Sequence, residues 1–403
     1  MNVKKITVIG DIMVEPPFME QAMRGGNCDF KPSFAPLKTI LKDSDYVIGN
    51  LETPLAGEEA GYTSRIVSFN SPDCLLDALV DIGIDAVSTV NNHCLDRGFD
   101  GLVRTCEVLD KYGIAHTGTY PKDFDGDRIL YFTVGDTRFA MIAYTYATNA
   151  TINGNYLDDS NRHCVNLLRP QVGAKSLYAR MPENFYDTIA LIEELAGRKL
   201  IWEETIKLKI AMHIPVPTID NFVDEEELET WFKKIEADYN EARANADIVL
   251  FYPHAGGQFN VEPGLYTKRL VRKSAELGFD AVFAAHSHTT HRAEYVEGKP
   301  CFYSMGNVSM SPGTFYSVSE SLPEYGVAAH LYVENKRISK VTISLFKMVE
   351  ENGDPMRIVP VDDLYSSLEG EKREKLVADV ASVFQRITGR ALPEGALQKE
   401  YDL

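Results

Sequence analysis

Short apolar runs alternate with longer amphipathic segments along the first 120 residues. Strands are predicted at residues 5–9, 46–48, 85–90 and 114–117, where apolar runs end at turn-forming or polar residues. The segments 71–83 and 99–112 carry apolar residues at helical spacing. We expect the first helix to begin at Ser71-Pro72 and the second to end at Gly113, because these residues favour helix starts and stops. This alternation predicts βαβ units and a partly parallel sheet.

The strand pattern returns in the second half of the chain. Further strands are predicted at residues 131–134, 138–144, 248–252, 281–285, 301–304, 327–333 and 338–346. Gly135-Asp136 predicts a hairpin turn between the first two of these strands. Helices are predicted at 266–277 and 371–387. The pattern therefore predicts one α/β unit over residues 1–348, followed by a C-terminal helical tail at 349–403.

Residues 147–246 interrupt this pattern with asparagine-rich and proline-containing loops. A charged helix is predicted at 225–243, with Leu228, Phe232 and Ile235 as its apolar stripe. We interpret the segment as an insertion that covers the sheet edge as a lid or cap. A peripheral decoration without a role in chemistry is the alternative interpretation.

The chain has 403 residues, and its net charge is −18, from 59 acidic and 41 basic residues. An acidic surface repels phosphate backbones, so we expect no nucleic-acid partner. Solubility alone explains such a charge. An anionic substrate, either a small molecule or a polymer, would require local positive charge, which a bound metal supplies.

No apolar run approaches 18 residues, so no membrane-spanning helix is expected. The apolar stretch near the N-terminus is broken at Gly10-Asp11, which is not typical of a signal peptide. Six scattered cysteines without a CxxC pair are typical of reduced thiols in a cytoplasmic protein. An exported protein lacking its leader would show the same pattern.

Residues that commonly bind metals follow five of the predicted strands. They are Asp11, Glu52, Asn92-His93, His254 and His286-Ser287-His288. A histidine at one strand end is more often structural, but the carboxyl ends of parallel strands meet at one edge, where ligands bind. Carboxylate, carboxamide and imidazole groups suit Mn, Zn or Fe. The set therefore predicts a metal site at this edge.

The order of these segments resembles the calcineurin-like metallophosphoesterases, and more closely their CapA branch of capsule (poly-gamma-glutamate) synthesis. The matching segments are Gly10-Asp11, Asn50-Leu51-Glu52, Asn91-Asn92-His93 with Asp96 and Gly98, His254, His286-Ser287-His288 and Gly306-Asn307. The resemblance covers about residues 4–120 and 247–310. It implies a four-layer α/β/β/α sandwich with two stacked sheets, and metal-dependent hydrolysis of a phosphoester.

The resemblance also implies roles for individual residues. Glu52 would bridge two divalent metal ions; Asn92, His254 and His286 would complete one site, and Asp11 and His288 the other. His93 would protonate the leaving group. Asp96 would orient the loop of His93 or cap the following helix.

Asn91, Arg65 and Asn307 are candidates for contacting the substrate. For Arg65 a surface position is the alternative, and for Asn307 a turn.

The sequence departs from the superfamily pattern at Met13, where a histidine ligand is usual. We therefore expect the Asp11 site to be weak. Two other functions stay open. One is hydrolysis or transfer at an amide such as a gamma-glutamyl linkage, with Asn149, Asn153 and the lid holding a polymer. The other is a non-catalytic role in polymer synthesis, with a degenerate site.

Overall fold

The computed structural model describes residues 3–64, 68–171, 184–198, 200, 204, 208, 223–312, 321–350 and 355–403. Arg65 and the proline-containing stretch at 215–217 lie outside the described residues. The α-helices are α1 (Pro16–Ala22), α2 (Lys31–Phe34), α3 (Lys38–Leu41), α4 (Cys74–Asp81), α5 (Gly98–Tyr112), α6 (Ala150–Asn153), α7 (Asn184–Ala196), α9 (Glu225–Asn245), α10 (Leu265–Leu277), α11 (Val361–Ser367) and α12 (Gly370–Thr388). Short 3-10 turns lie at Arg24–Gly26, Ala35–Leu37, Glu58–Ala60 and Arg162–Cys164.

The first sheet contains eight strands within the described residues, in the order β13-β12-β11-β1-β2-β3-β4, with β14 also paired to β12. These strands are β1 (Lys4–Ile12), β2 (Tyr46–Leu51), β3 (Ala86–Ser88), β4 (Ala115–Thr117), β11 (Tyr325–Glu334), β12 (Arg337–Val349), β13 (Arg357–Pro360) and β14 (Tyr401–Asp402). Strands β1 to β4 pair in parallel, as the βαβ pattern predicts. The remaining pairs, from β1–β11 outward, are antiparallel.

The second sheet has the order β5-β6-β7-β8-β10-β9. Its strands are β5 (Leu130–Val134), β6 (Thr137–Thr145), β7 (Ile248–His254), β8 (Ala281–Phe283), β9 (Ala293–Val296) and β10 (Lys299–Phe302). The predicted hairpin at Gly135-Asp136 joins β5 to β6 and is confirmed. Strands β6, β7, β8 and β10 pair in parallel, which places the ends of β7 and β8 at one edge.

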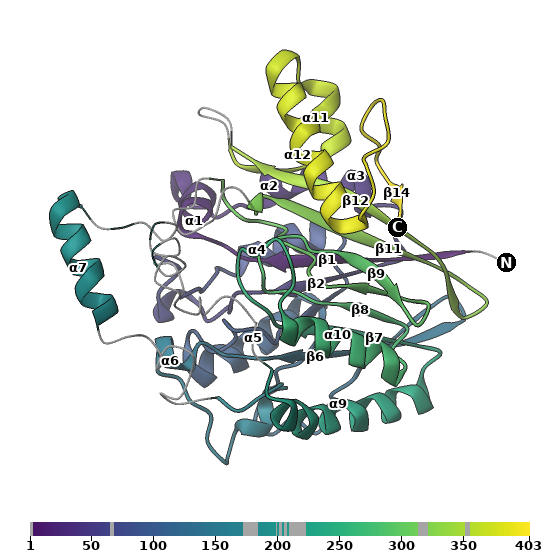
Figure 1. Ribbon diagram of the computed structural model, residues 1–403. Coiled ribbons are helices and arrows are strands. Elements are labelled where there is room, and N and C mark those ends of the chain that lie inside the picture. The colour runs from purple at the N-terminus through teal and green to yellow at the C-terminus, as the bar shows by residue number, and fades with distance from the viewer. Residues whose placement is uncertain are drawn as a thin grey trace.

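The two sheets pack face to face and are covered by helices on their outer faces (Figure 1). Along β6 the side chains alternate: Phe139 and Met141 face the core between the sheets, while Ala140 and Ile142 face helices α9 and α10. Helices α1 to α5 bury apolar side chains against the outer face of the first sheet. The predicted four-layer α/β/β/α arrangement is therefore confirmed.

The C-terminal residues are more closely integrated than a helical tail. Strands β13 and β14 both pair with β12, so a boundary at residue 349 would divide the first sheet. Helix α12 buries Leu376, Val380 and Val383 in the core that lies between the sheets. The segment 349–403 thus completes the main unit.

The position of helix α9 makes the candidate lid smaller than the predicted segment 147–246. Its stripe of Leu228, Phe232 and Ile235 is buried against the outer face of the second sheet, so this helix belongs to the α layer. Helix α7 lies away from both sheets (Figure 1), and its Leu195 is 79% exposed. A lid role for the remainder of 147–246 stays a prediction.

Two further expectations are wrong in detail. Helix α4 begins after Asp73, because Ser71 instead bonds Thr53 through its hydroxyl, 2.8 Å away. Cys28 and Cys74 form a disulfide with a Cα–Cα distance of 6.1 Å, so they are not reduced thiols. The other four cysteines are free and buried. None of the helices in the described part of the chain is both long and apolar enough to cross a membrane.

Candidate metal centre

The strand ends bring all of the predicted metal ligands to one buried place between the sheets. Asp11 lies near the end of β1, Glu52 directly follows β2, and Asn92 lies beyond β3. His254 ends β7, while His286 and His288 follow β8. Each of these six side chains is at most 2% exposed. The edge predicted from the sequence is thus the place where the two sheets jointly position ligands.

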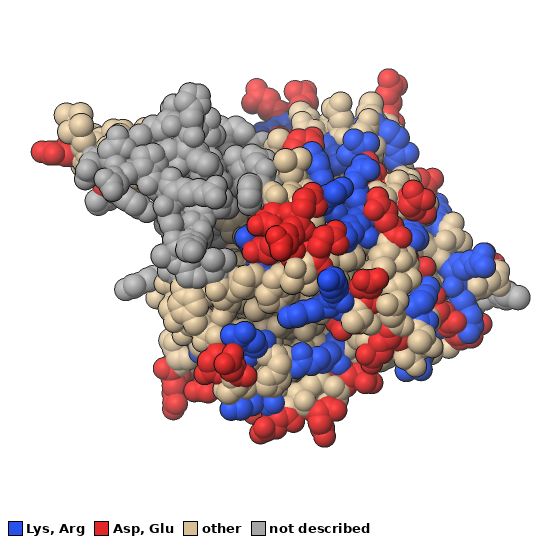
Figure 2. Space-filling view, turned by 60° about the horizontal axis from the view of Figure 1, so that its bottom comes forward, with Lys and Arg blue, Asp and Glu red and all other residues tan. Residues whose placement is uncertain are grey.

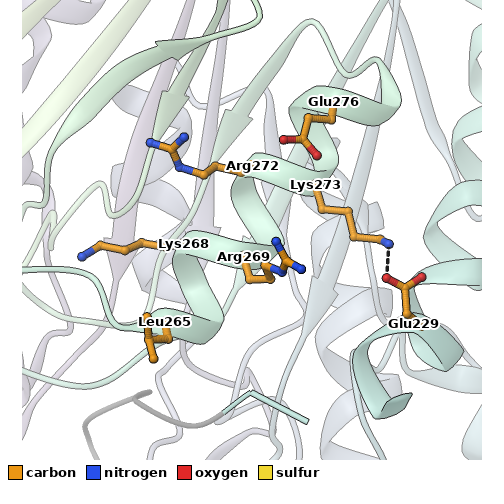
Figure 3. Close-up of a pocket in the computed structure, with 7 residues that line it drawn as sticks. All are labelled: Glu229, Leu265, Lys268, Arg269, Arg272, Lys273 and Glu276. Carbon is orange, nitrogen blue, oxygen red and sulfur yellow. Dashed lines mark hydrogen bonds and ion pairs between the residues drawn. The ribbon is translucent and has the colours of Figure 1, made fainter. Parts of the chain in front are cut away.

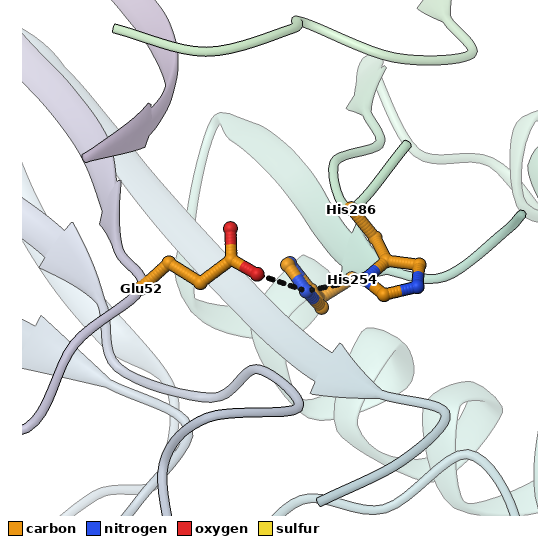
Figure 4. Close-up of side chains that lie close together, drawn as sticks. All are labelled: Glu52, His254 and His286. Atoms are coloured by element: carbon orange, nitrogen blue, oxygen red, sulfur yellow. Dashed lines mark hydrogen bonds and ion pairs between the residues drawn. The ribbon is translucent and has the colours of Figure 1, made fainter. Parts of the chain in front are cut away.

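Four donor atoms surround one point in this cluster. His254 Nε2 lies 3.3 Å from Glu52 Oε1 and 2.7 Å from Asn92 Oδ1. His286 Nδ1 lies 3.1 Å from His254 Nε2 and 3.2 Å from Asn92 Oδ1. Figure 4 shows Glu52, His254 and His286 directed toward one another. A metal with bonds of about 2.1 Å separates tetrahedral ligand atoms by roughly 3.4 Å, so this spacing fits one ion.

A second group shares Glu52. His288 Nε2 lies 3.8 Å from Glu52 Oε1, and His288 Nδ1 lies 3.8 Å from Asp11 Oδ2. The side chain of Asn50 donates to Asp11 Oδ1 over 2.7 Å and so orients that carboxylate. Candidate ligand atoms within each group, Glu52–His254–His286 and Asp11–Glu52–His288, lie within 4.8 Å of one another. Glu52 is therefore common to both groups.

Both carboxylate oxygens of Glu52 are buried and receive no hydrogen bond from a described residue, and Oε1 has the His254 ring nitrogen 3.3 Å away. Buried polar atoms in folded proteins almost always have a partner. A divalent cation held by either ligand group would supply a partner for this carboxylate. The donor set of two carboxylates, one carboxamide and three imidazoles also suits such an ion. These residues fit the metal ions that the sequence predicts.

Burial sets the protonation of the cluster. It lowers the pKa of His254 to about 4 and that of His286 well below its usual value, so both imidazoles are neutral near pH 7. Burial raises the pKa of Asp11 well above its usual value, and the charge of Glu52 raises it further. Neutral imidazoles are the form that binds metals, and a cation would favour the ionised carboxylates.

The backbone at two ligands is strained. His286 has φ 106° and His288 has φ 55°, conformations that residues with a Cβ rarely adopt. Strain of this kind persists where surrounding contacts enforce it, and it is concentrated at functional sites. Here the His286 N–H donates to Asp11 Oδ2 over 3.1 Å, which joins the turn to β1.

His93 lies beside the ligands and is held by Asp96. His93 Nδ1 is 2.6 Å from Asp96 Oδ2, and the same oxygen accepts the Phe69 N–H over 2.7 Å. Burial acts to lower the pKa of His93, but the charge and hydrogen bond of Asp96 outweigh it and raise the pKa. The Phe69 ring packs edge-on against His93, with ring centroids 4.4 Å apart. Asp96 therefore orients His93, one of the two roles considered from the sequence.

Two predicted substrate contacts have other partners in the structure. Asn91 donates to the Leu51 carbonyl over 2.8 Å and accepts the His93 N–H over 3.1 Å, so it shapes the loop. Asn307 Oδ1 lies 2.8 Å from His288 Nδ1, and its amide donates to the His288 carbonyl over 2.9 Å. Both residues support the site, and a contact of either with substrate stays a prediction. Arg65 lies outside the described residues.

Tyr146, just before the insertion, and two asparagines near its start reach the site as well. Tyr146 OH lies 2.7 Å from His286 Nε2. Asn149 Nδ2 lies 3.5 Å from His93 Nδ1, and Asn153 donates to Asp96 Oδ1 over 3.3 Å. Sequence reasoning did not single out Tyr146, although it lies one residue beyond a strand end, because tyrosine is not a usual ligand.

A surface cleft shares no residue with the metal centre. It has a volume of about 270 Å³ and is lined by Leu265, Lys268, Arg269, Arg272, Lys273, Glu229 and Glu276 (Figure 3). Its cations are largely paired: Arg269 with Glu225 at 3.2 Å, Arg272 with Glu294 and Lys273 with Glu229. Basic and acidic side chains are interspersed on the face shown in Figure 2. We therefore assign no anion site here.

Two solved structures resemble this fold at low similarity. A hypothetical protein from Thermus thermophilus has 14% identity and a TM-score of 0.42, with coverage of 85% of this chain and 99% of that one. A putative 5'-nucleotidase from Staphylococcus aureus has 13% identity and a TM-score of 0.40, with coverage of 93% and 57%. Similarity this low carries no argument about function.

Sequence comparison is more informative. The capsule biosynthesis protein CapA of Bacillus anthracis is 20% identical over 323 residues, 79% of this chain and 63% of that protein. The PGA biosynthesis protein CapA of Bacillus subtilis is 20% identical over 326 residues, with coverage of 80% and 68%. The chain thus spans about two thirds of the length of these relatives. The profile of the family described as bacterial capsule synthesis protein PGA_cap matches residues 5–311, and the chain therefore belongs to this family.

Proposed function

We propose that this chain is a metal-dependent hydrolase that cleaves phosphoesters at the centre around Glu52. The observation that carries the proposal is the buried Glu52 carboxylate, which lacks hydrogen-bond donors among the described residues and lies between two ligand groups. A purely structural glutamate in this position would leave a costly unpaired group. Asp11 and His288 on one side, and Asn92, His254 and His286 on the other, would hold two divalent ions.

Divalent ions bound there would polarise a phosphoryl oxygen and lower the pKa of water. The protein's own contribution is positioning. Asn307 fixes the ring of His288, and Asn50 fixes the carboxylate of Asp11. Burial between the sheets excludes bulk water, which strengthens electrostatic interactions at the site.

His93 would donate a proton to the departing alkoxide. Asp96 occupies Nδ1, so Nε2 is the nitrogen that would transfer the proton. Asp96 raises the pKa of His93 and so favours the protonated form of this histidine. An imidazolium held in this way is suited to general acid catalysis.

The test is turnover of bis(p-nitrophenyl) phosphate and p-nitrophenyl phosphate by protein loaded with Mn, Zn or Fe. We expect His93→Asn to lower turnover by roughly 10²- to 10⁴-fold while metal content stays unchanged. His163→Asn is the matched control, because His163 is exposed and outside the cluster. If fully loaded protein cleaves no phosphoester, or if His93→Asn retains full activity, the proposal fails.

Hydrolysis or transfer at a gamma-glutamyl amide is the second candidate. Two observations support it: the carboxamides of Asn149 and Asn153 lie beside His93 and Asp96, and one relative is named for PGA biosynthesis. Release of amino groups from gamma-glutamyl peptides by the metal-loaded protein, with no turnover of phosphoesters, would favour this candidate over the first.

A further inference from the structure

Tyr146 contacts two candidate ligands at once. Its backbone N–H donates to the His254 carbonyl over 3.0 Å, next to the pairing of β6 with β7. Its hydroxyl lies 2.7 Å from His286 Nε2, and the two ring centroids are 4.8 Å apart. The tyrosine is therefore fixed to one ligand through the backbone and to the other through its side chain.

The hydroxyl contacts the nitrogen that faces away from the ligand cluster. His286 Nδ1 is the atom near His254 and Asn92, at 3.1 and 3.2 Å. If Nδ1 binds a metal through its lone pair, Nε2 carries the proton and donates it to the phenol oxygen. Partners of this kind fix the tautomer and ring orientation of metal-binding histidines.

We propose that Tyr146 is a positioning residue that sets metal affinity by orienting His286. The proposal rests on the metal centre described above. Since Tyr146 also begins the segment that carries Asn149 and Asn153, it joins the metal ligands to the residues around His93. The start of the insertion is then a functional part of the site.

The strand offers a matched control in Tyr144. Its hydroxyl donates to Asp238 Oδ2 over 2.7 Å, and its ring packs in the outer core with α9. Tyr144→Phe and Tyr146→Phe each remove one hydroxyl and its hydrogen bond from the same stretch of chain. Only Tyr146→Phe removes a hydrogen bond to a candidate metal ligand.

The experiment measures Co²⁺ affinity by competition with a chelator for the unaltered protein and both variants. We expect Tyr146→Phe to weaken binding of one ion about 10- to 100-fold, and Tyr144→Phe to leave affinity unchanged. Metal-free protein should melt at similar temperatures in the two variants. Equal affinity in Tyr146→Phe and the unaltered protein would overturn the proposal and leave the metal centre intact.

A second measurement does not depend on a folded variant. In the Co²⁺ form of the unaltered protein, the His286 Nε2–H should give a paramagnetically shifted proton signal that exchanges slowly with water. Absence of a protected signal from this histidine would contradict the proposed hydrogen bond. If the unaltered protein binds no Co²⁺, Mn²⁺ or Zn²⁺, the proposed function itself fails, and this proposal fails with it.

Discussion

At the scale of single residues, Met13 is the most informative departure from the motif pattern that the sequence resembles. It stands where a histidine ligand is usual, and its side chain is buried with Phe69, Phe259 and Met310. Phe69 and Phe259 in turn contact the rings of His93 and His288. Met13 thus lies in an apolar cluster that borders His93 and His288, and a weaker Asp11 site stays a prediction.

Met13→His should strengthen binding of the second ion, because it adds an imidazole beside Asp11 and His288. We expect at least a tenfold gain, which corresponds to about 1.4 kcal/mol. Isothermal titration with Mn²⁺ would measure it, with Met13→Leu as the control for repacking. Identical affinities in the two variants would show that position 13 does not face the site.

At the scale of elements, the site depends on the close approach of β1 to the chain after β10. The Asp11 N–H donates to the Gly306 carbonyl over 3.0 Å. A Cβ on Gly10 would lie 2.0 Å from that carbonyl oxygen, which is backbone and cannot move aside easily. Glycine at position 10 therefore permits the contact that places Asp11.

Gly10→Ala should destabilise the fold by more than about 2 kcal/mol, because relief of the clash requires a backbone shift. Gly49→Ala in β2 is the control, since the three atoms nearest to its Cβ would be side-chain rather than backbone atoms, at 3.0 to 3.6 Å. Urea unfolding of both variants measures the difference. Equal midpoints would mean that β1 can shift without cost.

Sequence patterns predicted elements best where local signals agree with the final packing. Helix α5 ends at Gly113, which has φ 71°, as expected. The polar residues that follow predicted strands located the ligand cluster, because the carboxyl ends of parallel strands lie at a common edge of the sheet. Ser71 does not cap helix α4, because its hydroxyl bonds instead to Thr53, 18 residues away in the sequence. Tyr146 was missed for a similar reason: its function depends on a histidine 140 residues away.

At the scale of the whole molecule, the C-terminal end stabilises the first sheet. Glu400 accepts hydrogen bonds from Lys5 in β1, at 2.9 Å, from Tyr332 in β11 and from Thr342 in β12. Burial alone would raise the pKa of Glu400, but these hydrogen bonds lower it to about 2. The sequence could not predict these hydrogen bonds, because Glu400 and Lys5 are 395 residues apart in the chain.

Glu400 should make stability depend on pH. Its folded-state pKa lies below its usual value of 4.5, so its stabilisation is present above about pH 4.5 and is lost as the pH falls toward 2. We expect Glu400→Gln to cost about 1–2 kcal/mol at pH 7, after allowance for solvent screening, and progressively less in acid.

Urea midpoints of both proteins between pH 7 and pH 3 test this prediction. The titratable groups that interact with Glu400 include Lys5, Tyr332, His330 and Lys340. Because burial lowers the pKa of His330 and the charge of Glu400 acts to raise it, the titration of His330 also differs between the two proteins. A difference that is constant across this range would contradict the assignment.

The central claim is that Glu52 and its neighbours hold divalent metal. The most direct test is metal analysis of purified protein after dialysis against trace manganese, zinc and iron without chelators, alongside His254→Ala and the control His163→Ala. We predict about one to two equivalents in the unaltered protein and the control, and loss of the tighter ion in His254→Ala. Folded protein without metal, or unchanged metal content in His254→Ala, would contradict the claim.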